Sequence, residues 1–263
     1  MQHFDYKPVF NLKRIEKSEK KRVAMKNLKE LSLLIICLTI TACVDAQFRK
    51  TVYGNGKVVS EERTPLQASG VRVSTGIDVF LTQGDKLNLV VEADENLHEY
   101  IITEVKNGIL DVYTDANIRG AEMKRVYITL KTINSVSSSS AGDIIGESPV
   151  ETDDLKISVS SAGDIKLEVY VNNIDANISS SGDVTLTGEA GFMEVDLSSA
   201  GDLNAYNLKV KEADISVSSA GGADIFVTDK LTARASSAGG INYRGDPKNV
   251  NAHSSSAGGI HRK

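Results

Sequence analysis

The second half of the chain carries one short motif seven times, and its spacing limits what the chain can fold into. The motif reads SSSAGDI at 138–144, SSAGDI at 160–165, SSSGDV at 179–184, SSAGDL at 198–203, SSAGGADI at 218–225, SSAGGI at 236–241 and SSSAGGI at 254–260. Successive motif glycines lie 21, 19, 19, 20, 18 and 19 residues apart. A near-constant period of this length is typical of stacked-repeat proteins, in which each repeat packs against its neighbours.

The residues around each motif alternate between apolar and polar types. Leu155–Val159 precedes the turn at Ala162-Gly163 and Asp164–Val169 follows it, and every second residue of both segments is apolar. This alternation is the period of a strand with one buried face. The repeat therefore predicts an all-β protein, a right-handed parallel β-helix (β-solenoid) of about 20 residues per coil, with three short strands in each coil.

The small residues of the motif are expected to build the corner of each coil. Glycine there permits a positive φ. Counting back four residues from an inward Ile165 reaches Ser161, so the second serine of each pair is predicted to point inward and the first outward. The inward set is Ser140, Ser161, Ser180, Ser199, Ser219, Ser237 and Ser256; the outward set is Ser139, Ser160, Ser179, Ser198, Ser218, Ser236 and Ser255.

An acidic residue follows the motif glycine in four coils, at Asp143, Asp164, Asp183 and Asp202. Stacked carboxylates about 5 Å apart repel one another by roughly 1 kcal/mol in water. We expect them to cap backbone amides of the corner, with their charges solvated. The alternative is a cation ladder, with Ca²⁺ as the candidate ion. The position becomes glycine in the last two coils, and either Gly222 or Asp224 fills it in the fifth.

Residues 1–46 are predicted to be an export signal with a basic lead. Leu31–Ala42 is a twelve-residue apolar run, which is short for a membrane span and suits the core of a signal. Met25 begins an ordinary signal sequence and is the predicted start of translation. Two processing sites remain open: lipid attachment at Cys43, or cleavage after Ala46. A retained membrane anchor is a third, less favoured alternative.

Either cut removes or modifies the two cysteines of the chain, so the mature protein is expected to have no disulfide. We predict export to the periplasm, the outer membrane or the cell surface, with membrane contact only through a lipid at Cys43. Residues 47–263 contain 21 Lys and Arg against 30 Asp and Glu, a formal net charge of −9. This acidity argues against a nucleic-acid partner, because phosphates require a basic surface.

The exported part is expected to form a lead-in at 47–65 and a single solenoid domain at 66–263. Within that domain, residues 66–135 lack the serine motif and are predicted to form wider N-terminal coils, and residues 136–263 the repeat coils. The Asn107-Gly108 pair between two apolar segments predicts a two-residue hairpin turn. The last coil has no helical cap. It either pairs with a second copy to form a homodimer or is protected from pairing by its charged tail.

Several segments outside the serine motif carry a resemblance to a known protein family when they are taken together with the SSAGD/SSAGG series. They are Gly54–Val59, Gly76–Val79, Thr82–Asp85, Glu92–Leu97, Val105–Leu110 and Tyr243–Pro247. As a set they resemble the "putative auto-transporter adhesin, head GIN domain" family of Bacteroidetes, over about residues 50–263. The resemblance implies a parallel β-helix, related in shape to pectate-lyase-like folds, on exported envelope proteins. It brings no established catalytic residue.

Residues suited to catalysis are few and scattered. His98, His253 and His261 lie far apart in sequence or near the chain end, and His98 is expected on the surface. Asp78 and Asp85 flank a predicted strand and offer one possible carboxylate pair. We therefore predict a non-catalytic envelope protein without a cofactor, an adhesin or surface-binding module whose ligand is a glycan or a protein. The alternative is a polysaccharide-active enzyme, a lyase or hydrolase, on the same scaffold.

Overall fold

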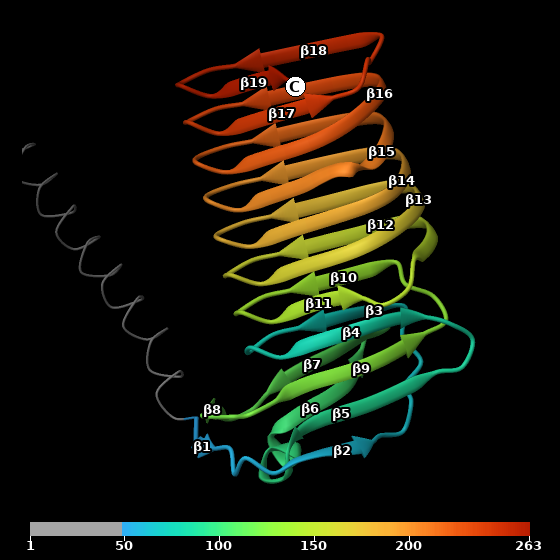
Figure 1. Ribbon diagram of the computed structural model, residues 1–263, viewed down its shortest axis with the longest axis vertical. Helices are drawn as coiled ribbons and strands as arrows, with labels where there is room; N and C mark the ends of the chain where they lie inside the picture. Colours follow the sequence, from blue (N-terminus) through green and yellow to red (C-terminus); the bar gives the residue numbers. More distant parts are fainter. Residues whose placement is uncertain (1–48) are drawn as a thin grey trace, which may run out of the picture. The chain divides into compact units, whose positions relative to one another are not determined.

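The predicted stack of β coils is present. The computed structural model describes residues 49–263, so the expected export signal, with Met25 and Cys43, lies outside the described residues. Parallel pairing joins five long strands in chain order: β12 (Val150–Val159), β13 (Asp164–Ile178), β14 (Asp183–Leu197), β15 (Asp202–Val217) and β16 (Gly222–Ala235). The coils lie one above another (Figure 1), and residues 49–263 are thus an all-β solenoid.

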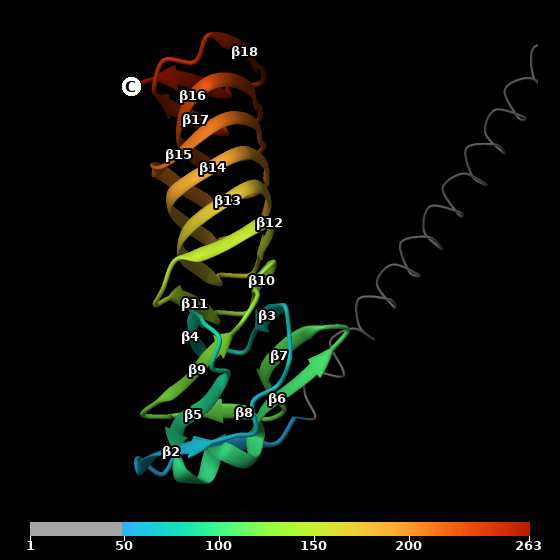
Figure 2. The same cartoon turned by 90° about the vertical axis from the view of Figure 1, so that its right-hand side faces the viewer.

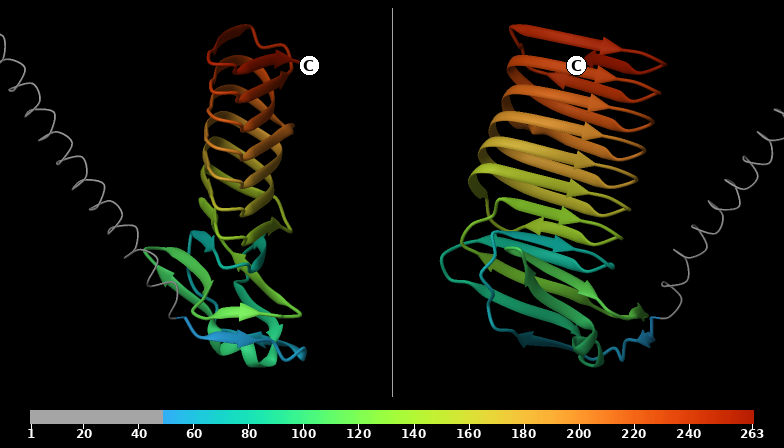
Figure 3. Two further views of the ribbon diagram at one scale, coloured as in Figure 1. Left: turned by 90° about the vertical axis from the view of Figure 1, so that its left-hand side faces the viewer. Right: turned by 180° about the vertical axis from the view of Figure 1, so that it is seen from behind.

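Each coil from β13 to β16 is one continuous strand, and the prediction of three short strands per coil was wrong. In β13 inward and outward residues alternate until Asn172 and Asn173, which both point to solvent. This pair changes the phase of the alternation and bends the strand without interrupting it. The bends lie along one edge of the stack and the tight serine corners along the other, as the front and rear views show (Figures 1 and 3).

The core is a set of inward columns, one residue per coil in each column. Ile165, Val184, Leu203, Ala223 and Ile241 share a column by strand register and are each at most 2% exposed. Burying such a side chain contributes about 2 kcal/mol relative to leaving it exposed. A single coil has no partner for this face, so the stack supplies the stability.

The serine corners differ from the prediction. The second serine of every motif is exposed and has a φ between 47° and 68°, as at Ser161 (53°). The first serine is half-buried in all but the last coil. The prediction failed because the second serine has a left-handed backbone conformation, which reverses the chain within the corner. Every second residue points inward along a strand, but this rule does not continue across such a corner.

The motif glycines do not supply the positive φ; they fill the inward place at each corner. A Cβ at Gly163 would lie 2.2 Å from Ser138 Oγ, and a Cβ at Gly221 would lie 2.0 Å from Leu197 Cδ2. Both approaches are far shorter than van der Waals contact. Glycine is therefore required here because the preceding coil passes too close for a side chain.

Residues 66–135 enter the stack out of chain order. Strand β3 (Gly70–Val73) lies between β7 (Ile109–Thr114) and β10 (Ser135–Ser138), all parallel. Likewise β4 (Asp78–Gln83) lies between β9 (Lys124–Leu130) and β11 (Asp143–Gly146). Strands β3 and β4 come first in the sequence but form the second coil of the stack. Strands β7 and β9, which follow them, form the coil at the N-terminal end. The chain then continues with β10 and β11 on the other side of the second coil.

Antiparallel strands close this N-terminal end. Strand β5 (Asn88–Asp94) pairs with β9, and β2 (Val58–Glu62) pairs with β5. On the other face β6 (Ile101–Lys106) pairs with β7 through the predicted hairpin, in which Asn107 and Gly108 have φ of 52° and 78°. The 3₁₀ helix η2 (Glu95–Tyr100) connects β5 to β6 and lies beneath the strands in the side view (Figure 2).

Five further strands complete the fold. A two-stranded parallel sheet joins β1 (Thr51–Tyr53) to β8 (Asn117–Arg119). At the other end, β17 (Gly240–Arg244), β18 (Asn249–Ser254) and β19 (Gly259–Arg262) form the final turns. No helix within residues 49–263 has the length and apolarity needed to cross a membrane.

Candidate functional site

The aspartates form the continuous stripe that the motif predicted, one per coil. Strand register aligns Asp143, Asp164, Asp183 and Asp202 and extends the stripe downward to Asp78. Upward, the register places Gly222, not Asp224, in the slot of the fifth copy. The column then continues through the glycines of the last two coils.

The carboxylates accept hydrogen bonds from backbone amides of the next coil. The amides of Asp164, Asp183 and Asp202 donate to the Oδ1 atoms of Asp143, Asp164 and Asp183, over 3.3, 3.2 and 3.2 Å. The same amides also donate to the carbonyls of the motif glycines beneath. The stripe therefore caps corner amides, but between coils rather than within a turn.

The environment of Asp143 disfavours its charged form. Partial burial, followed by the negative charges of Asp164 and Asp78, raises the pKa of its carboxyl above the ordinary value. In residues 49–263 no three His, Cys, Asp or Glu side chains converge as a metal site would require. The stripe offers one carboxylate per coil along a line, and the cation ladder stays a prediction.

The suggested pair of Asp78 and Asp85 does not form. Asp78 belongs to the stripe, at the start of β4. Asp85 lies beyond the other end of β4, with a side chain 91% exposed and 3.1 Å from Lys131 Nζ. The two carboxylates therefore do not provide an acid and a base for one substrate.

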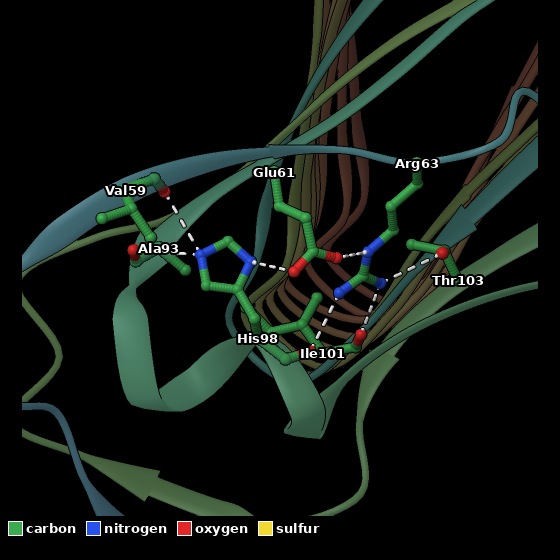
Figure 4. A network of polar contacts seen from close by, with 7 residues as sticks. All are labelled: Val59, Glu61, Arg63, Ala93, His98, Ile101 and Thr103. Carbon is green, nitrogen blue, oxygen red and sulfur yellow. Dashed lines mark hydrogen bonds and ion pairs between the residues drawn. The ribbon is translucent and has the colours of Figure 1, made fainter.

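His98 is buried, and the expectation of a surface residue was wrong. Its side chain is only 9% exposed because η2 turns it under β2 (Figure 4). The Nε2 atom lies 3.2 Å from the Val59 carbonyl and 3.3 Å from the Ala93 carbonyl. Both neighbours accept hydrogen bonds, so Nε2 is a donor, and Nδ1 faces Glu61 Oε2 at 3.5 Å.

Arg63 completes the network around Glu61. Its Nε donates to Glu61 Oε1 at 2.8 Å, and its guanidinium also donates to the carbonyls of Ile101 and His98 (Figure 4). These contacts join β2 to η2 and β6. The histidine is thus engaged in holding the N-terminal strand in place, with its donor nitrogen directed at the backbone.

Asp94 is a second buried polar centre, which the sequence reasoning missed. It is fully buried, and its carboxylate accepts the amides of Gly56 (2.8 Å), Glu122 (3.0 Å) and Met123 (3.2 Å). A Cβ at Gly54 would lie 2.2 Å from Asp94 Oδ2. Two of the segments that carry the family resemblance, Gly54–Val59 and Glu92–Leu97, therefore meet here. Their residues hold the N-terminal end of the fold together.

The outward faces of the repeat coils carry open grooves, and two of them are lined by polar side chains from several coils. One, of ≈ 550 Å³, follows the serine corner and is lined by the half-buried first serines with Asn177, Asp196, Arg234 and His253. The other, of ≈ 570 Å³, lies at the bend near Gly191, beside Lys209 and Lys211. Tyr170 borders the second groove and is 44% exposed. An exposed ring with amines and amides beside it is chemistry suited to binding a sugar.

Several solved structures share this fold over nearly their whole length. A putative adhesin from Bacteroides fragilis matches with a TM-score of 0.75 and 22% identity, covering 81% of this chain and 100% of that one. A putative adhesin from Parabacteroides merdae gives 0.69 and 23%, covering 81% and 99%. A putative lipid-binding protein from Parabacteroides distasonis gives 0.69 and 21%, covering 81% and 100%. No curated protein matches the chain.

The family model settles which group of proteins this is. The model described as "putative auto-transporter adhesin, head GIN domain" matches residues 69–247, which include the stripe, the groove at the bend and every serine corner except the last. The solenoid, the motif series and this match agree. The chain belongs to the head GIN domain family.

Proposed function

We propose that this protein is an exported, non-catalytic binding module of the cell envelope, an adhesin that holds a surface ligand on the side of its solenoid. One observation carries the proposal: the outward residues of five successive long strands form long, ordered polar faces with open grooves. Rigid faces of this kind bind extended ligands at little conformational cost. Family membership and the adhesin neighbours support the same reading.

The side chains favour binding over turnover. The one buried histidine within residues 49–263 has its donor nitrogen on backbone carbonyls. A retaining or inverting glycosidase uses two carboxyl groups on opposite sides of one bond. The stripe carboxylates instead lie in a single file and accept backbone amides. The export signal expected at residues 1–46 supplies the envelope location.

A glycan array with product analysis tests the proposal. Saturable binding of the purified protein without cleavage is the expected result, and each hit is repeated with Tyr170→Ala. Loss of binding in that variant, but not in a Tyr53→Ala control on β1, would assign the ligand to the groove at the bend. Cleavage of any glycan would overturn the non-catalytic assignment in favour of a polysaccharide-active enzyme.

A further inference from the structure

The two ends of the solenoid are finished differently. At the N-terminal end, β5 and β2 extend one face, β6 extends the other, and η2 connects them. At the C-terminal end, β18 pairs with β16 and β19 pairs with β17, and within residues 49–263 no strand pairs with the opposite edges. The last coil is the open end of the stack (Figures 1 and 3).

The open end presents backbone groups without strand partners. The amide of Ser255 donates to the Ala235 carbonyl at 3.0 Å, toward the coil beneath. Alternate residues of a strand direct their N–H and C=O groups to opposite sides. The N–H and C=O groups of Val250, Ala252 and Ser254 therefore point away from the stack. Such a row is a template for an added strand.

Apolar side chains are uncovered at the same place. Val250 is 46% exposed, whereas Leu231 directly beneath it is fully buried. Ala252 is exposed above the buried Ala233. One further strand on β18 would place apolar residues over both and continue the inward columns.

The net positive charge of the C-terminal end favours an acidic strand as its partner. Residues 239–263 contain four basic residues (Arg244, Lys248, Arg262 and Lys263) and one acidic residue, Asp246. Residues 136–238 contain six Lys and Arg against seventeen Asp and Glu. Two copies meeting end to end would oppose basic residues to basic residues, whereas an acidic segment is attracted.

We infer that the free edge of β18 is the docking site for an extended acidic segment of a partner protein. The segment adds to the sheet as one more strand. Its alternate apolar residues cover Val250 and Ala252, and its carboxylates lie at the basic end of the stack. This inference deepens the proposed binding role by naming a protein partner. Its test uses peptides rather than glycans, so either proposal can fail alone.

The probe is a short fluorescent peptide of alternating valine and glutamate, compared with one of valine and lysine. Fluorescence polarisation should show saturable binding of the glutamate peptide that weakens with salt, and at least about tenfold weaker binding of the lysine peptide. Hydrogen exchange should slow at the amides of Val250, Ala252 and Ser254 and stay unchanged at Asn251 and His253. This readout requires no variant.

Two variants locate the site. Ala252→Pro removes an amide that points away from the stack and leaves the ladder beneath intact, so it should weaken peptide binding about tenfold. Asn251→Ala, a side-chain change on the same strand, should leave binding unchanged.

Several outcomes would overturn the inference. These are no saturable binding of the glutamate peptide, equal binding of both peptides, or exchange protection away from β18. Light scattering over a concentration series tests the homodimer. A dimer that Ala252→Pro abolishes would assign the edge to a second copy instead of a partner.

Discussion

Removing one charge from the stripe, by Asp143→Asn, should stabilise the protein at neutral pH. Asp143 lies one coil from both Asp78 and Asp164, at the strand spacing of about 4.8 Å. A pair of unit charges at that distance repels by about 0.9 kcal/mol in water, and by more where burial lowers the dielectric. Screening by salt reduces the sum of the two pairs, so we expect a gain of about 1 to 2 kcal/mol.

The gain should depend on pH in a definite direction. Asparagine keeps the oxygen that accepts the Asp164 amide, so only the charge changes. The pKa of Asp143 is raised above its ordinary value of 3.8 in the folded state, so the wild-type protein loses stability as the pH rises through and above that value. The difference between variant and wild type should be near zero in acid and reach its plateau by neutral pH.

Urea denaturation followed by circular dichroism, over a pH series, measures the effect. Asp202→Asn is the matched control, because Asp202 has a charged neighbour only on the Asp183 side and Gly222 on the other. Its gain should be about half as large or less. A variant that is less stable at neutral pH, or a difference independent of pH, would refute the argument from repulsion. Calcium that stabilises only the wild type would establish the cation ladder instead.

Three further predictions concern the packing. Gly239→Ala should cost about 1 to 3 kcal/mol, since its Cβ would lie 2.9 Å from Val217 Cγ1 and near two carbonyls, whereas Gly240→Ala, with nothing within 4 Å, should change the free energy of unfolding by less than about 0.5 kcal/mol. His98→Ala should cost about 2 to 3 kcal/mol in a thermal melt because it removes a buried ring and its hydrogen bonds to the Val59 and Ala93 carbonyls, and His253→Ala, in the exposed last coil, should be silent. Asp94→Asn should cost about 2 kcal/mol, measured by denaturation, because an amide cannot accept all three backbone donors; equal stability would contradict the assigned contacts.

The candidate site was predictable only where it repeats. The spacing of the motif placed Asp143, Asp164, Asp183 and Asp202 in one column, because residues one period apart must stack in a solenoid. Asp94 and His98 occur once, and no period reveals them. Their burial depends on which loops and strands of the N-terminal end pack together, and that is a long-range property.

The solenoid and its inward columns could be predicted from the pattern of residues alone. Alternation such as that of Leu155–Val159 is a local property, and burying every second residue leaves few other solutions. Tertiary structure decided the direction of Ser161, because left-handed residues at the corner reverse the phase of the strand. It also decided that β3 enters between β7 and β10, and that β18 ends the stack uncovered. Both depend on the free energy of pairing strands that are distant in sequence, which the local pattern of residues does not record.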